Sequence, residues 1–306
     1  MRKVNILFLV GLCLGALVAL VLVVAEPQRH IVTALGPTPV AAAGTESSTD
    51  SVAPDTPSSP SPTPSGKTTP SSGGAKSGAT TAQALEALVP RGHVSVVVYD
   101  RTAGTTLLSV NADRTYTSAS LVKLMIAVSA LENGTQAGVV KEMLSRSDDD
   151  TASALWVANG ETNIVESAIQ RMGLTGTHPP ASPGRWGDTE ITAGDITKIY
   201  RYLFTKAPAD ERTIILAALH GATEFGADGF RQYFGIPDAL GAGNFAVKQG
   251  WSCCRPTRML HTSGTVGKND RYLVTVLTEQ PQSVGYATAS AQITSVVKNL
   301  LPLLGM

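Results

Sequence analysis

The sequence predicts an α+β fold: a mainly antiparallel five-stranded sheet flanked by helices, with an all-helical subdomain inserted between its two halves. Three observations predict it. Residues 93–111 have the pattern of a β-hairpin, residues 244–279 have the pattern of three more strands, and residues 136–242 between them are rich in helical patterns. Strands at both ends of a folded region that enclose a helical middle are typical of a single sheet with an inserted subdomain.

The first 35 residues have the composition of an export signal. Two basic residues precede an apolar run over 4–25 that is broken only by Asn5. This run is long for a cleaved signal and sufficient to span a bilayer. Lipid attachment at Cys13 is disfavoured, because Leu12 precedes it where a small residue is expected. We therefore expect an extracytoplasmic protein, either secreted after cleavage or anchored to the cytoplasmic membrane by the N-terminal segment.

Residues 36–81 are predicted to be a disordered linker. The segment consists mainly of Pro, Ser, Thr, Gly and Ala, holds eight of the chain's 18 prolines, and contains no aromatic residue. Such a composition cannot bury enough apolar surface to offset the entropy of ordering, and the prolines keep the chain extended. The linker would space a folded domain, residues 82–306, from the membrane or the cell wall.

The domain begins with helical spacing over 82–89, which ends before a proline. Residues 93–100 are apolar and largely β-branched, and a polar turn joins them to a second strand over 105–111. Residues 118–132 open with serines and are apolar over a stretch too long for a strand, so they predict a buried helix.

The remaining elements follow the same patterns. Four further segments have helical spacing: 151–159, 162–172, 193–204 and 211–219. Three strands and a final helix are predicted after them: 244–251, 258–266, 271–279 and 285–301. The two strands of the hairpin and the three late strands supply the five strands of the sheet.

Composition excludes several function classes. Lys+Arg and Asp+Glu are 24 each and no basic run is present, so nucleic acid is not an expected partner. Cys253 and Cys254 are the only cysteines of the domain, which rules out a disulfide framework; they are structural, a vicinal disulfide or free thiols. The histidines form no metal spacing, and His261 is expected to be a packed or hydrogen-bonded side chain. We expect no cofactor and no metal.

Three short motifs bear residues suited to nucleophilic chemistry. Ser120 and Lys123 lie three residues apart on one predicted helix, which places the amine beside the hydroxyl. Alone, this pair is better explained by a helix cap and a lysine that extends to solvent. Ser147-Asp148-Asp149 and Lys248-Gln249-Gly250 follow later in the chain, and these two motifs favour a reactive site.

In order and approximate spacing, these motifs resemble the Ser-x-x-Lys, Ser-Asp-Asn and Lys-Thr-Gly motifs of class A β-lactamases and penicillin-binding proteins, over essentially the whole folded domain. The resemblance implies a serine acyl hydrolase. Ser120 would attack an acyl carbonyl with Lys123 as base, and Ser147 and Lys248 would relay a proton to the leaving nitrogen. The backbone N–H groups of Ser120 and Trp251 would form the oxyanion hole.

The resemblance also assigns a substrate-binding side. Asp149, Gln249, Gly250 and Trp251 occupy the positions that would contact a bound acyl group. The substrate would be a small molecule or a cell-wall peptide, with a β-lactam, a peptide and an ester left open. We expect the protein to act as a monomer, with membrane contact limited to the N-terminal segment.

One departure from the family concerns deacylation. Class A β-lactamases carry an Arg-Trp-Glu segment whose glutamate activates the hydrolytic water, and here the segment reads Arg185-Trp186-Gly187. Deacylation is therefore expected to be impaired. Asp188 or Glu190 would either substitute for the glutamate or cap the helix that begins near 193.

Two further departures affect substrate binding. Asp149 replaces an asparagine, and a carboxylate there would repel an acyl oxygen and favour the charged form of Lys123. Gln249 replaces a threonine near the expected position of a substrate carboxylate, where Arg255 could supply charge. These departures leave an alternative function open, a non-catalytic module of the same fold that binds the cell wall or another ligand.

Overall fold

The computed structural model describes residues 81–252 and 257–306. The predicted export segment, residues 36–80 of the predicted linker, and the 253–256 segment with both domain cysteines and Arg255 lie outside the described residues. Within the described part of the chain, no helix is long and apolar enough to cross a membrane.

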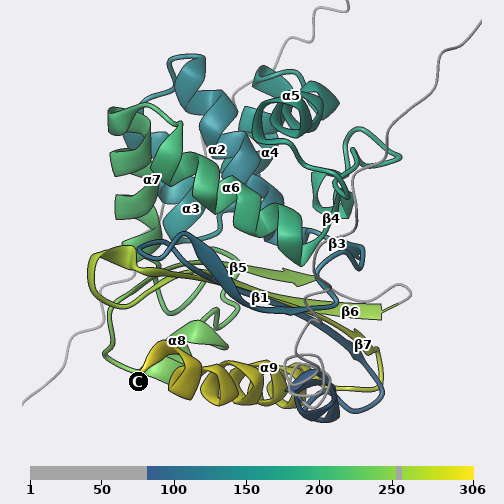
Figure 1. The fold of residues 1–306 in the computed structure, drawn as a ribbon. Coiled ribbons are helices and arrows are strands. Elements are labelled where there is room, and N and C mark those ends of the chain that lie inside the picture. Colours follow the sequence, from purple (N-terminus) through teal and green to yellow (C-terminus); the bar gives the residue numbers. More distant parts are fainter. Residues whose placement is uncertain (1–80, 253–256) are drawn as a thin grey trace, which may run out of the picture. The chain divides into compact units, whose positions relative to one another are not determined.

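A five-stranded sheet forms the centre of the fold, in the order β2-β1-β7-β6-β5, and every neighbouring pair is antiparallel. The predicted α+β architecture is confirmed (Figure 1). The hairpin and the late strands meet where β1 pairs with β7. The strand bounds are β1 His93–Asp100, β2 Thr105–Val110, β5 Phe245–Ser252, β6 Thr257–Val266 and β7 Tyr272–Pro281.

Helices cover both faces of the sheet (Figure 1). On one face lies the inserted subdomain: α2 Lys123–Glu132, α3 Ala137–Ser145, α4 Asp149–Ala158, α5 Thr162–Met172, α6 Ala193–Thr205 and α7 Ala209–His220. On the other face lie α8 Ile236–Leu240, α9 Tyr286–Leu300 and the helical residues 81–87. Each face has its own apolar core. Because β6 and β7 are buried on both faces, their sequences lack the alternation of a half-exposed strand.

The central helix of the subdomain, α2, is buried on all sides. Leu124, Met125, Ile126 and Val128 are each at most 2% exposed. A helix that is apolar all round must be surrounded, and α3, α4, α5 and α7 all pack against this one. The fold therefore holds the start of α2 rigidly, which is where Lys123 lies.

The structure differs from the sequence prediction at several short elements. The predicted helix 118–132 is split into a 3-10 turn, η1 Ala119–Val122, followed by α2, and Ala119 at the start of the turn has a φ of 45°, outside the right-handed helical region. A two-stranded sheet of β3 Tyr116–Thr117 and β4 Glu190–Ile191 was not predicted. Its strands are too short to show a two-residue period. Neither α3 nor α8 was predicted as a separate element.

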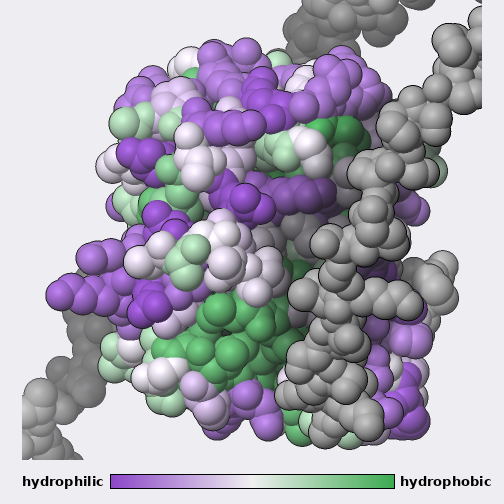
Figure 2. All heavy atoms as spheres, viewed as in Figure 1, coloured by the Kyte–Doolittle hydropathy of each residue, from purple (hydrophilic) through white to green (hydrophobic). Residues whose placement is uncertain are grey.

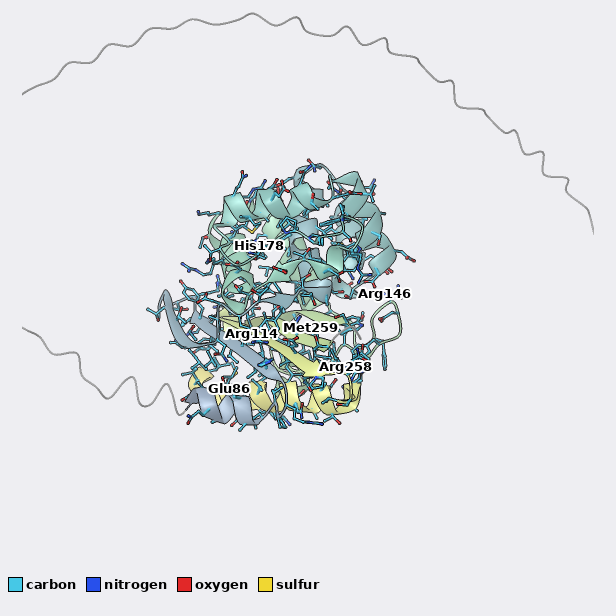
Figure 3. The ribbon with its side chains drawn as sticks, turned by 90° about the vertical axis from the view of Figure 1, so that its right-hand side faces the viewer. Glu86, Arg114, Arg146, His178, Arg258 and Met259 are labelled. Atoms are coloured by element: carbon cyan, nitrogen blue, oxygen red, sulfur yellow. The ribbon has the colours of Figure 1, made fainter. Side chains whose placement is uncertain are left out.

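The surface of the domain is uneven in polarity. In the view of Figure 1, the surface over the helical subdomain is mainly hydrophilic, whereas an apolar patch lies lower, between the sheet and the α8–α9 layer (Figure 2). Figure 3 shows the side of the molecule where the two layers meet, with Arg258 and Met259 on β6 between the subdomain and α9. Met259 lines the cavity described next.

Candidate active site

A cavity of about 580 Å³ opens between the helical subdomain and the edge strand β5. Ser120, Asp149 and Trp251 line it, together with the loop over 185–188. Its other described lining residues are Thr117, Ala119, Asp228, Ser252, Thr257, Met259 and Tyr286. Residues of the first two motifs and the residue that follows the third thus meet at one cavity, although the first and third motifs lie more than a hundred residues apart along the chain.

Ser120 and Lys123 are in direct contact. The Lys123 Nζ donates to Ser120 Oγ at 2.9 Å and to the Ser147 backbone oxygen at 2.7 Å. It also contacts Ser147 Oγ at 3.3 Å and forms an ion pair with Asp149 Oδ1. The Lys123 side chain is fully buried, so these acceptors take the place of water around its amine. These contacts therefore supply the buried Lys123 amine with the polar partners that it would otherwise find in water.

Lys248 reaches the same network from β5. Its Nζ donates to Ser147 Oγ at 2.8 Å and to the Gln249 backbone oxygen at 3.0 Å, and its side chain is buried. Ser147 Oγ therefore accepts from both lysines. An acceptor shared by two amines leaves its own hydroxyl proton free to be donated elsewhere.

Two residues next to the reactive groups have a strained backbone. Ala119, which precedes the nucleophile, has a φ of 45°, and Ser147 has a φ of 54°. Neither is a glycine, and the left-handed region is costly for other residues. Strain of this kind persists only where the surroundings enforce it, and here it aims Ser120 and Ser147 at the two lysines.

Burial lowers the pKa of both lysines, which makes their neutral amines more accessible. For Lys123 the loss of solvation lowers the pKa, and the negative charge of Asp149 partly reverses this. For Lys248 the pKa lies well below its usual value because of burial and the adjacent charge of Lys123. Two amines in contact with one hydroxyl cannot both be charged without repulsion.

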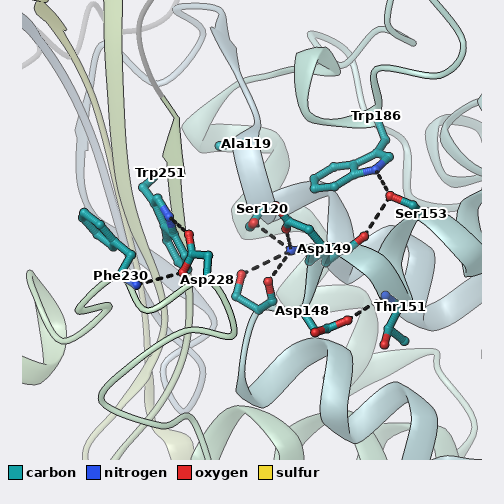
Figure 4. A network of polar contacts seen from close by, with 12 residues as sticks. Ala119, Ser120, Asp148, Asp149, Thr151, Ser153, Trp186, Asp228, Phe230 and Trp251 are labelled. Carbon is teal, nitrogen blue, oxygen red and sulfur yellow. Dashed lines mark hydrogen bonds and ion pairs between the residues drawn. The ribbon is translucent and has the colours of Figure 1, made fainter. Parts of the chain in front are cut away.

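Asp148 and Asp149 have different roles, and the structure separates them (Figure 4). Asp148 caps α4 by accepting from Thr151 N at 2.6 Å. The carboxylate of Asp149, 63% exposed, faces Lys123 and the cavity. The alignment of Ser147-Asp148-Asp149 with Ser-Asp-Asn, in which Asp149 takes the place of asparagine, agrees with this geometry.

Gly250 and Gln249 lie on β5, and the structure places them differently. A Cβ at Gly250 would be 3.0 Å from the Ser118 backbone oxygen, so the glycine lets β5 approach η1 closely. The Gln249 side chain is buried and donates to the backbone oxygens of Gln232 and Phe234, at 2.9 and 2.6 Å. It does not line the cavity, because its longer amide is engaged by backbone behind the strand.

The 185–188 loop lies across the cavity from β5. Asp188 forms an ion pair with Arg185, and Trp186 Nε1 donates to Ser153 Oγ at 3.1 Å. The expectation that Asp188 or Glu190 caps the next helix is wrong, because Thr192 accepts from the Asp195 backbone N at 3.1 Å and caps α6.

Sequence reasoning missed one acidic residue of the cavity. Asp228 lies on the loop between α7 and α8 and accepts from Trp251 Nε1 at 3.0 Å and from the Phe230 backbone N at 2.9 Å. No motif marks it, and Trp251, which follows the third motif, gives no sign in the sequence that its indole binds this carboxylate. Among the residues that the structure describes, no group of three or more His, Cys, Asp or Glu is placed to hold a metal ion.

His261 is buried beneath the site, as expected. Its Nε2 lies 2.9 Å from the Thr117 backbone oxygen, and its Nδ1 accepts from the Thr278 backbone N at 3.3 Å. Burial lowers its pKa from 6.5 to about 4, because the charged ring would lose its solvation.

This shift predicts an acid-sensitive stability. Between pH 6.5 and 4 the unfolded chain binds a proton at His261 that the folded chain does not, so the free energy of unfolding falls as the pH is lowered. The loss approaches about 3 kcal/mol at pH 4. His261→Gln keeps a donor for Thr117 and does not titrate, so urea denaturation should give it a flatter profile than wild type. Parallel profiles would contradict the assignment.

Comparisons with known proteins point to one family. The model of the family described as "Beta-lactamase enzyme family" matches residues 79–139, which include Ser120 and Lys123. The proteins named "Putative lipoprotein LppW" from Mycobacterium tuberculosis and Mycobacterium bovis are 36% identical over 222 residues, covering 68% of this chain and 69% of the relative.

Solved structures share the fold at low sequence identity. PBP-A, also solved in a mutant form as an acyl-enzyme with penicillin G, has a TM-score of 0.60 at 17% identity, over 74% of this chain and 96% of that one. A β-lactamase from Chitinophaga pinensis has a TM-score of 0.61 at 15% identity, over 74% and 99%. The TLA-3 extended-spectrum β-lactamase has 0.61 at 14%, over 75% and 100%. The family match and the LppW relatives place the chain in a β-lactamase-like family, and the solved structures show that it has the fold of β-lactamases and penicillin-binding proteins.

Proposed function

We propose that the protein is an exported serine acyl hydrolase that forms an acyl-enzyme at Ser120. The observation that carries this proposal is the direct contact between Ser120 Oγ and the buried Lys123 amine at 2.9 Å. A hydroxyl beside a desolvated amine is an activated nucleophile, because the amine can accept its proton as the hydroxyl attacks.

Acylation would proceed through the contacts described above. The Ser120 proton passes to neutral Lys123 while Oγ forms a bond to the acyl carbon. The oxyanion is held by the backbone N–H groups of Ser120 and Trp251. When the tetrahedral intermediate collapses, the bond to the leaving nitrogen breaks, Ser147 gives that nitrogen its proton, and Lys123 returns a proton to Ser147 Oγ, 3.3 Å away. Lys248 holds Ser147 Oγ in place for this relay.

Deacylation would be slow in this protein. Gly187 stands where a water-activating glutamate is expected, and Asp188, the nearest loop carboxylate, is paired with Arg185. The acyl group, whether it comes from a β-lactam, a peptide or an ester, would therefore persist on Ser120.

We place the domain outside the cytoplasmic membrane. The basic and apolar N-terminal segment supports export, and the name of LppW describes that relative as a lipoprotein. Cleavage, a retained helix and a lipid anchor are distinguishable by the mass and the membrane partition of the mature protein.

Intact-mass measurement after incubation with penicillin G and with an activated fluorophosphonate tests the proposal. A stable mass increase in wild type that is lost in Ser120→Ala supports it, and the persistence of the penicilloyl adduct reports deacylation. If neither reagent modifies Ser120 in the folded protein, the proposed function is wrong.

One observation favours a second candidate, a non-catalytic module of the same fold. The ion pair between Asp149 and Lys123 stabilises the charged lysine, which cannot act as a base. Under this alternative, a cell-wall fragment would bind wild type and Ser120→Ala equally, with no turnover by either.

A further inference from the structure

Asp228 is a carboxylate of the cavity that no sequence motif marks. Neutral hydrogen-bond donors fix its position. The Trp251 indole holds one of its oxygens and the Phe230 backbone N–H holds the other, at 3.0 and 2.9 Å (Figure 4). Because the two donors bind separate oxygens, they orient the carboxylate in the absence of a ligand. They do so without cancelling its charge.

Of the three described aspartates that line the cavity, Asp228 differs from the other two in its ion pairing. Asp149 is paired with Lys123, and Asp188 is paired with Arg185. Among the residues that the structure describes, Asp228 has no ion-pair partner, although it lines the same cavity. Its negative charge is therefore available to a ligand, and it would attract a cationic group and repel an anionic one.

In the proposed relay Ser147 and Lys248 act on the leaving group, and Asp228 is held by the strand that carries Lys248. Asp228 accepts a hydrogen bond from Trp251, three residues after Lys248 on β5. Its negative charge raises the pKa of both Lys123 and Lys248. The Trp251 ring is itself engaged, stacked on Phe230 at 5.0 Å between centroids and with Lys248 Nζ 5.8 Å from its centroid. The carboxylate, rather than the ring, is therefore the group left for a ligand.

We propose that Asp228 is a specificity-determining residue that selects acyl donors with an ammonium group on the leaving-group side and disfavours donors with a carboxylate there. This specificity rests on the serine hydrolase function proposed above. It also accounts for Gln249, whose side chain is turned away from the cavity and offers nothing to a substrate carboxylate.

Three thioesters with one acyl group test the selection: acetylthiocholine, its uncharged isostere S-(3,3-dimethylbutyl) thioacetate, and S-acetyl-3-mercaptopropionate. Thiol release gives kcat/KM for each. Wild type should prefer the ammonium over the carboxylate thioester by about tenfold, equivalent to about 1.4 kcal/mol. Asp228→Asn should lose most of this preference, measured within each variant as the ratio of kcat/KM for the two charged thioesters so that any change in the rate with the isostere cancels, and Asp228→Glu should restore it. Asp113→Asn, which removes an exposed carboxylate outside this cavity, should leave it unchanged.

The outcomes separate the two proposals. Hydrolysis of the isostere by wild type but not by Ser120→Ala, combined with equal rates for both charged thioesters, would overturn the role of Asp228 and leave the hydrolase function standing. If no thioester is hydrolysed, binding of acetylthiocholine to Ser120→Ala, followed by NMR titration, decides instead. At least fivefold weaker binding to the Ser120→Ala/Asp228→Asn variant supports selection by Asp228, and equal binding overturns it.

Discussion

Replacing Gly187 with glutamate should accelerate deacylation of Ser120 by about a hundredfold, which is within the range for a positioned general base. The geometry permits the change. A Cβ at Gly187 would lie 3.8 Å from Ala119 Cα, an ordinary contact, and the backbone there does not require a glycine. The new carboxylate would start beside the residue that precedes the nucleophile, on the wall of the cavity that Ser120 also lines.

The measurement is the lifetime of the acyl adduct by intact mass after brief exposure to penicillin G. Gly187→Gln is the matched control, because it adds the same bulk without a base, and its adduct should persist as in wild type. If Gly187→Glu and Gly187→Gln decay at the same rate, the missing glutamate does not limit deacylation.

Much of the fold follows from the sequence because its long elements carry clear periods. The five strands and the buried α2 were predicted within a few residues, because short apolar or β-branched runs bounded by turn residues mark the strands and one long apolar run marks α2. The β3–β4 pair and α8 escaped prediction, because elements of two and five residues are set by tertiary contacts rather than by a pattern of their own.

The site was predictable only where spacing determines proximity. Lys123 lies one helical turn from Ser120, so their contact follows from local geometry. The meeting of Ser147 with Lys248 depends on the packing of β5 against η1 and was supplied by the family resemblance. The position of Asp228 depends on the course of an irregular loop, and the buried orientation of the Gln249 side chain, away from the cavity, depends on backbone oxygens that only the fold brings near.

Asp149→Asn should raise the rate of Ser120 acylation by ten- to a hundredfold near neutral pH. The Asp149 carboxylate raises the pKa of Lys123 and so opposes the effect of burial. Its removal lowers that pKa and increases the neutral fraction of the base. Because Asp149 is 63% exposed, solvent screens part of its charge, which favours the lower end of the range.

The pH profile identifies the cause of this gain. Acylation by a neutral lysine increases as the pH rises through the pKa of Lys123, so the rising limb of the profile should move to lower pH in Asp149→Asn. Asp150→Asn, which removes the neighbouring exposed carboxylate on α4, should leave the limb in place. A faster reaction with an unshifted limb would mean that Asp149 acts on the substrate oxygen instead. If Asp149→Asn is no faster at any pH and no acyl reagent labels it, the ion pair with Lys123 is not what restrains Ser120, and the binding-module alternative gains support.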